Sequence, residues 1–309
     1  MLREIQAVMD LLDSAAVCGE DVRQFLEAAG VADVSIQQVK GTEKSTDFVK
    51  ACICSNGRGP TLGIIGRLGG IGARPERLGL VSDADGAIVA LACAAKLGKM
   101  AARGDSLPGA VIVATHICPN APMQPHEPAP FMGSPIDIAT MNRHEIDPAM
   151  EAILSIDTTK GNWILNHSGF AITPTVKEGY ILRVSEDLLN IARIVANAPP
   201  VVLPVTTQDI TPYGNGVYHV NSIMQPATAT KAPVVGVATT ASTPIPGSAT
   251  GANQVFSLEM AARFCVEVAK AFTTEQCLPY DKKEFVHLTT LYGSMTHLQT
   301  PGKKTSRSE

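Results

Sequence analysis

Two kinds of hydrophobic spacing run along this chain, and they separate the expected helices from the expected strands. Apolar residues recur at helical spacing across 2–30, with an interruption at Gly19 and a stop at Gly30, so this stretch predicts two helices. Three strand-like stretches follow, at 34–39, 48–54 and 62–66. The polar residues 40–46 between the first two predict a hairpin connection.

The segment 78–121 organises the rest of the predicted fold. It begins with an apolar run at Leu80–Val81 that ends in an acidic cluster, and continues as a helix over 87–100 and an apolar strand over 110–115. Strand, helix and strand in this order are the signature of a βαβ unit in a parallel sheet. Ligands of such sheets gather at the carboxyl ends of the strands, so we expect a site where these two strands end.

The second half of the chain continues to alternate strands with helices. Further strands are predicted at 152–157, 169–173, 178–182, 201–205, 217–220 and 232–238. Helices are predicted over 185–197, with Ser185 as the cap, and over 256–272. The proline-rich segment 120–148 is expected to be irregular and to act as a lid over a site.

Together these elements predict an α/β fold with a mostly parallel twisted sheet flanked by helices. The predicted division of the chain is an N-terminal helical extension at 1–33, a core domain at 34–290 and a disordered tail at 291–309. The glycine-rich stretch 66–77 matches neither phosphate-binding motif, so we interpret it as a loop that needs positive φ angles and approaches the sheet backbone closely.

Composition narrows the class of protein and of partner. The 309 residues are 45% hydrophobic and 17% charged, which is typical of a globular protein. A net charge of −4 and the lack of basic runs with interleaved aromatics argue against nucleic acid. No apolar run approaches the roughly 20 residues that cross a bilayer, and no signal-peptide pattern is present, so we expect a cytoplasmic protein without membrane partners. Few charges and long apolar segments favour a homo-oligomer.

Acidic residues at predicted strand ends are the first candidates for chemistry. Asp83, Asp85 and Asp157 occupy such positions, as metal ligands and acid–base pairs do. The alternative is a helix N-cap, which we favour for Asp85 because it directly precedes the helix. Capping is a weaker explanation for Asp157, because the residues after it do not begin a helix.

A histidine and a cysteine follow the strand at 110–115. His116 and Cys118 alternate along the chain and would share a face if the strand continued to Cys118. They are interpretable as a nucleophile pair, as two metal ligands or as buried structural residues, and the structural role is favoured for Cys118. No HExxH or GxSxG motif is present.

Several segments, taken in order, resemble the core of the dinuclear-zinc aminopeptidases of the glutamyl/tetrahedral type. The matching segments are Gly63–Gly66, Ser82–Leu91, Val113–Thr115 and Leu154–Thr158. The resemblance implies a zinc-aminopeptidase-like core in which Asp83 is the metal-bridging aspartate and Asp157 a second carboxylate ligand. The family's paired glutamates fall on Cys118 and Pro119, and its late histidine ligand has no counterpart here.

The length of the chain and its Ser-Asp-Ala-Asp-Gly-Ala core, residues 82–87, also resemble the domain of unknown function 1177 family, which implies no activity.

The leading hypothesis is an enzyme of the amidohydrolase or peptidase type that acts on a small amino-acid-like or dipeptide substrate. Its expected catalytic residues are Asp83, His116, Cys118 and Asp157. Its expected substrate-binding residues are Asp85, Asn120 and Thr158. A divalent metal such as zinc would be held by Asp83 and Asp157. The alternatives are a metal-free small-molecule-binding or assembly protein on the same fold, and an enzyme based on Cys118 with His116 lowering the thiol pKa.

Overall fold

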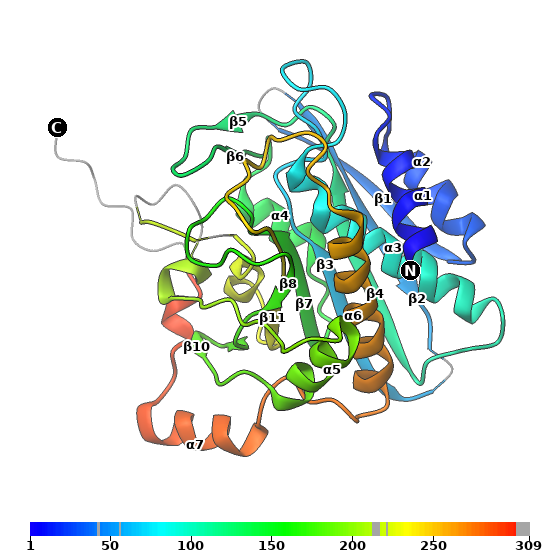
Figure 1. Ribbon diagram of the computed structural model, residues 1–309. Coiled ribbons are helices and arrows are strands. Elements are labelled where there is room, and N and C mark those ends of the chain that lie inside the picture. The colour runs from blue at the N-terminus through cyan, green and yellow to red at the C-terminus, as the bar shows by residue number, and fades with distance from the viewer. Residues whose placement is uncertain (42–43, 56, 212–216, 221, 301–309) are drawn as a thin grey trace.

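A computed structural model describes residues 1–41, 44–55, 57–211, 217–220 and 222–300. Its centre is a nine-stranded sheet that is flanked by helices (Figure 1). The order across the sheet is β1 (Asp33–Lys40), β2 (Ser45–Ile53), β4 (Gly109–Ile117), β3 (Gly59–Gly66), β7 (Ala152–Thr158), β11 (Val234–Thr240), β9 (Val176–Lys177) and β10 (Tyr180–Ile181), and β8 (Gly169–Ile172) also pairs with β11. The α/β class predicted from the sequence is confirmed.

The prediction of a mostly parallel sheet is wrong, because the sheet is mixed. Only the central strands β4, β3, β7 and β11 pair in parallel. The pairings of β1 with β2, β2 with β4, and β8 and β9 with β11 are antiparallel. A parallel neighbour requires a long crossover connection, and the short polar segment between β1 and β2 permits only a hairpin.

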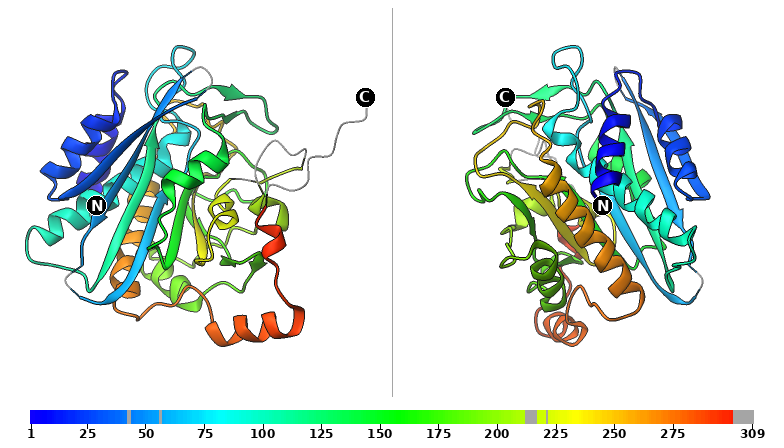
Figure 2. Two further views of the ribbon diagram at one scale, coloured as in Figure 1. Left: turned by 180° about the vertical axis from the view of Figure 1, so that it is seen from behind. Right: turned by 45° about the vertical axis from the view of Figure 1, so that its right-hand side comes forward.

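Helices cover the two faces of the sheet unequally. Packed on one face or over its outer edge are α1 (Leu2–Leu12), α2 (Gly19–Ala28), α3 (Asp85–Ala101), α5 (Glu186–Ala196) and α6 (Val255–Thr273) (Figure 2). On this side Ile5 of α1, Ile88 of α3 and Ile64 of β3 belong to one hydrophobic core. The opposite face is covered by the short helix α4 (Ile138–Glu145) and by part of the segment 201–231. α7 (Lys282–Tyr292) projects from the body and contains no buried residue (Figure 1).

Two glycines bring the start of α3 against the end of β3. A Cβ atom on Gly86 would lie 2.3 Å from the carbonyl oxygen of Arg67, and one on Gly66 would lie 2.4 Å from the carbonyl oxygen of Gly86. Both distances are far below van der Waals contact, so only glycine allows this approach. The close approach expected for the glycine-rich loop is therefore observed, whereas Gly66 and the other glycines of that loop, Gly69, Gly70 and Gly72, do not have positive φ.

Several predicted elements differ from those in the structure. Leu80–Val81 forms no strand, and Ser82–Ala84 is a 3₁₀ turn, so Asp83 does not end a strand; the βαβ unit runs from β3 through α3 to β4. Residues 201–205 form only one bridge, Val202 to Ile172, and the predicted strand at 217–220 does not form. The proline-rich segment contains α4 and a hairpin of β5 (Met123–Gln124) and β6 (Phe131–Met132).

The division of the chain at residues 33 and 290 stays a prediction. Of the predicted tail, residues 291–300 include the end of α7 and a 3₁₀ turn at Thr296–Leu298, and residues 301–309 lie outside the described part. Within the part that the structure describes, no helix combines the length and the apolar content needed to cross a membrane.

Candidate functional site

A cavity of about 540 Å³ opens at the carboxyl ends of the central parallel strands. Arg67–Gly69 follow β3, Asp157–Thr159 end β7, and Ile245 and Gly247 come from the loop after β11. Asp83 enters from the turn before α3, and the hairpin of β5 and β6 forms part of the opposite wall. This is the edge of an α/β sheet where ligands usually bind.

Asp83 is buried in this cavity, and its carboxylate is held by backbone amides. The amide groups of Gly69 and Gly70 both donate to Oδ2, at 2.5 and 3.2 Å. Burial raises the pKa of Asp83 well above its ordinary value, and the nearby charge of Asp157 raises it further, against the opposing effect of the two amides. Asp83 therefore holds its proton above the pH at which an exposed aspartate loses it.

Asp157 lies beside it at the end of β7 and is 2% exposed. Its Oδ1 accepts from the amide of Thr158 at 2.8 Å, and its Oδ2 accepts from Ser222 Oγ at 2.5 Å. Burial raises the pKa of Asp157 to about 7, although the Ser222 hydroxyl and the charge of Arg67 lower it. Asp157 thus releases its proton near neutral pH, and the charge that it then carries favours the protonated form of Asp83.

Behind the two aspartates lies a buried chain of polar side chains. Arg67 Nη1 donates to Glu145 Oε2 at 2.5 Å and to Asn142 Oδ1 at 3.1 Å, and Nη2 donates to Gln225 Oε1 at 3.3 Å. The other oxygen of Glu145 lies 2.9 Å from Nδ1 of His116. Burial acts to raise the pKa of Glu145, but Arg67 and His116 together hold it below its ordinary value. Arg67 lines the cavity, so this chain holds its guanidinium group in the wall with Glu145 as its counter-ion.

Of the residues expected at the site, Asp83, Asp157 and Thr158 line the cavity, and the remaining four, Asp85, His116, Cys118 and Asn120, do not. Asp85 is fully buried in a separate polar cluster. Its Oδ2 accepts from Lys160 Nζ at 2.6 Å and from Thr239 Oγ1 at 2.7 Å, and Asn253 donates to Oδ1 at 2.7 Å. The carboxylate makes no capping hydrogen bond, so the interpretation of Asp85 as a helix cap is wrong.

His116 and Cys118 face different surroundings. His116 pairs with Glu145, as described above, whereas Cys118 Sγ lies 3.6 Å from Asn120 Oδ1 in a small apolar cluster with Val81 and Met132. Burial raises the pKa of the Cys118 thiol. A thiol with a raised pKa is a poor nucleophile, so the geometry favours the structural role for Cys118.

Sequence reasoning missed four residues of the site, which are Arg67, Glu145, Ser222 and Gln225. A signal existed for Arg67, because it is the first charged residue after the apolar strand that ends at Gly66. Glu145 and Gln225 come from α4 and a short 3₁₀ turn, and no spacing links them to the sheet.

The carboxylates do not fit the zinc pair that the aminopeptidase resemblance implies. In the described part of the chain no group of three or more His, Cys, Asp or Glu side chains is arranged to hold a metal. Zinc sites need three or four protein ligands. In addition, Oδ2 of Asp83 and both oxygens of Asp157 already accept hydrogen bonds from N–H and O–H donors, which leaves them fewer lone pairs for a metal.

The chain resembles known proteins in its fold and in its family. No curated protein matches the chain. Among solved structures, the bottromycin maturation enzyme BotP has a similar fold, with a TM-score of 0.55 and 13% sequence identity over 86% of this chain and 69% of that one. The family model described as protein of unknown function (DUF1177) matches residues 37–302, so the chain belongs to the DUF1177 family.

Proposed function

We propose that this protein is an amide or peptide hydrolase that acts on a small amino-acid-like or dipeptide substrate bound between Asp83 and Asp157. The observation that carries the proposal is a pair of buried carboxyl groups in one cavity, which retains a proton at neutral pH. Two carboxyl groups in this state supply a general acid and a general base together. The fold similarity to a maturation enzyme agrees with this proposal and adds nothing about the substrate.

The proposed chemistry uses Asp157 as the ionised group and Asp83 as the protonated one. Ionised Asp157 accepts a proton from a water molecule whose oxygen forms a bond to the amide carbon of the substrate. Protonated Asp83 donates a hydrogen bond to the carbonyl oxygen while charge develops there. The C–N bond then breaks, and the proton held on Asp157 passes to the departing nitrogen. Because the donor set does not fit zinc, no step uses a metal.

The walls of the cavity favour a small substrate with an amino group. Its volume of about 540 Å³ lies in the range of small-molecule sites, about 300–1,000 Å³. The carboxylates of Asp157 and Asp137 attract a cationic amine, whereas the charge of Arg67 is largely balanced by Glu145. Met132, Met141 and Phe131 provide apolar surface for a side chain.

A second candidate is a metal-free small-molecule-binding protein on the same fold. The observation in its favour is that internal donors already engage Oδ2 of Asp83 and both oxygens of Asp157, as in a site that binds without reacting. This candidate predicts the same ligand class in the same cavity without turnover.

The experiment is a turnover and binding assay on protein dialysed against a chelator, with a panel of dipeptides and aminoacyl amides. We expect hydrolysis to persist after chelation, and Asp157→Asn and Asp83→Asn each to lower kcat by about a hundredfold or more. The matched control is Asp105→Asn, an exposed aspartate after α3, which should leave kcat unchanged. Binding without turnover would support the second candidate, and neither binding nor turnover would refute both.

A further inference from the structure

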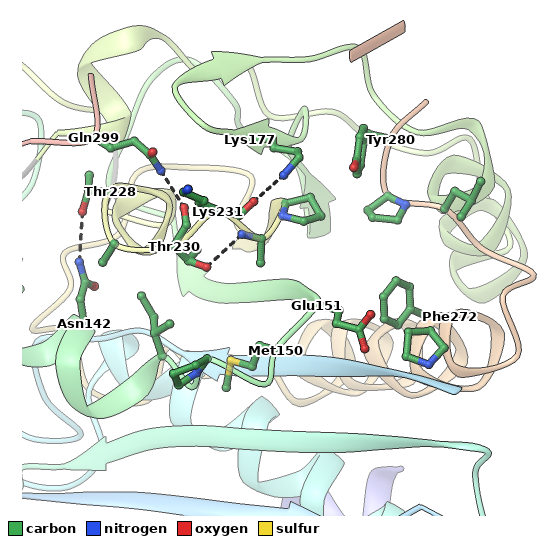
Figure 3. Close-up of a pocket in the computed structure, with 18 of the residues that line it drawn as sticks. Asn142, Met150, Glu151, Lys177, Thr228, Thr230, Lys231, Phe272, Tyr280 and Gln299 are labelled. Carbon is green, nitrogen blue, oxygen red and sulfur yellow. Dashed lines mark hydrogen bonds between the residues drawn. The ribbon is translucent and has the colours of Figure 1, made fainter. Parts of the chain in front are cut away.

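A second and larger cavity, of about 1170 Å³, lies at the opposite edge of the sheet (Figure 3). Pro60 near the start of β3, Glu151 just before β7 and Pro233 just before β11 all line it. It is therefore formed at the amino ends of the same strands whose carboxyl ends hold Asp83 and Asp157.

The interior of this cavity is largely apolar. Met150 lies at its base next to the strands, and Phe272 and Tyr280 form one side wall (Figure 3). Ile146 from the end of α4 and Leu278 complete the apolar surface. Such walls favour a ligand with a hydrocarbon body.

The charges around the cavity are mainly positive. Five cationic side chains line it, against two anionic ones, Glu151 and Glu275. Lys177 is neutralised by Glu178 at 2.8 Å, and it also donates to the carbonyl oxygen of Lys231 at 2.6 Å. The other four cations form no ion pair with any described residue: Arg58, Arg143, Lys231 and Lys282. Glu151 Oε1 already accepts from the amide of Thr61 at 3.0 Å.

We propose that this cavity is a binding site for a small amphiphilic anion, with its carboxylate among the unpaired cations and its aliphatic body against Met150 and Phe272. An excess of unpaired positive charge around an apolar interior is complementary to such a ligand and repels cationic ones. The chain's own C-terminal segment is a poorer occupant. It continues from Thr300, which lines the cavity, but it carries Lys303, Lys304 and Arg307.

The test is isothermal titration calorimetry of decanoate into the full chain, with decylamine as the probe of opposite charge. We expect saturable binding of decanoate only. The double variant Lys231→Glu/Lys282→Glu should weaken it by about tenfold or more. The matched control is Lys40→Glu/Arg103→Glu, which changes the net charge equally at two exposed positions outside the cavity and should bind decanoate normally.

A second variant distinguishes binding inside the cavity from general electrostatic attraction of decanoate to the protein surface. Ala232→Trp fills the cavity and keeps every charge, so it should abolish decanoate binding in a chain with an unchanged circular dichroism spectrum. Undetectable binding to the unmodified chain, or equal affinity in the charge-reversed and control variants, would overturn the proposal. A requirement to remove residues 301–309 before decanoate binds would overturn it as well, because the tail would then be the occupant.

Discussion

The carboxylate of Asp157 is almost completely shielded from water, and this controls its protonation. Its folded-state pKa of about 7 lies above the ordinary value of 3.8, so the folded chain holds a proton that the unfolded chain has already lost. The stability that this proton provides is complete below about pH 4 and is lost as the pH rises through 7. The pKa of Asp83 is raised in the same direction, so its proton adds to the stability that is lost as the pH rises.

Asp157→Asn should therefore flatten the pH dependence of stability. An amide carries no charge, so at pH 8 we expect the variant to exceed the unmodified protein in free energy of unfolding by about 4 kcal/mol, and to match it near pH 4. Urea unfolding at both pH values measures the difference. Asp105→Asn provides the exposed control, and equal slopes for all three chains would contradict the buried, protonated state of Asp157.

The ion pair of Arg67 and Glu145 gives a second prediction at this scale. Both side chains are at most 2% exposed, so Glu145→Gln leaves the Arg67 charge buried without its partner and should cost about 3–5 kcal/mol. The comparison is Glu20→Gln, which breaks the exposed pair with Arg23 and should cost far less, because water screens that pair. Chemical denaturation of the two variants measures both values, and similar costs would show that burial does not matter here.

Individual aspartates show which part of the site could be predicted from the sequence and which part could not. Asp83 and Asp157 are identifiable because an acid after an apolar run is visible in the sequence, and the structure places both in one cavity. Asp85 follows the same pattern but pairs with Lys160, because a neighbouring loop supplies a buried cation. The identity of such partners depends on tertiary packing, which local spacing does not encode.

At the scale of elements, the glycine contact between β3 and α3 positions Asp83. Helix α3 is buried on nearly all sides and lies between the sheet, α1 and α6, so it has little freedom to move away from an added methyl group. Gly86→Ala would place a Cβ atom 2.3 Å from the carbonyl oxygen of Arg67. We expect a loss of about 1–3 kcal/mol in stability together with weaker ligand binding in the Asp83–Asp157 cavity.

Thermal unfolding of Gly86→Ala beside Gly161→Ala tests this contact. A Cβ atom at Gly161 would lie 3.5 Å from the carbonyl oxygen of Ile245, which is an ordinary contact, so that variant should unfold near the unmodified temperature. If both variants unfold at the same temperature, the glycine contact does not position the helix.

Long periodic elements were predictable from the sequence, and short ones were not. The α3 and α6 patterns extend over four or more turns, and the structure contains both helices. Helix α4 has only eight residues and lies between prolines. The main local feature that predicts it is Asp137, whose side chain caps the helix by accepting a hydrogen bond from the amide of Thr140. Residues 201–205 are apolar enough for a strand but form only one bridge to the sheet. Burial of apolar side chains does not by itself supply a neighbouring strand to pair with.

At the scale of the whole molecule, two cavities lie at opposite edges of one sheet and share a wall. The smaller one contains the two aspartates, and the charges that line the larger one are mainly positive. Ile138 and Ala139 of α4 line both, and Asn142 connects them, since it lines the larger cavity and accepts from Arg67 in the wall of the smaller one. Self-association, expected from the few charges, stays a prediction that sedimentation analysis would test.

Because of this shared helix, occupancy of the two cavities should be linked. We expect saturating decanoate to change the affinity for a dipeptide by about fivefold or more, with the reciprocal change in decanoate affinity that linkage requires. Asn142→Ala should reduce this coupling, measured as the ratio of the decanoate affinities with and without the dipeptide. Calorimetric titrations with and without the second ligand measure the effect, and independent affinities would show that α4 does not transmit it.

The most direct test of the central claim is a carbon-13 NMR titration of aspartate side-chain carboxyls in the unmodified protein and in Asp83→Asn and Asp157→Asn. We predict one carboxyl with an apparent pKa near 7, absent in Asp157→Asn, and a second whose pKa is raised well above that of an exposed aspartate, absent in Asp83→Asn. Asp157→Asn should also lower the pKa of Asp83, because the facing charge is removed. If every aspartate titrates below about pH 5, the two carboxyls do not share a proton-retaining cavity, and the proposed chemistry is contradicted.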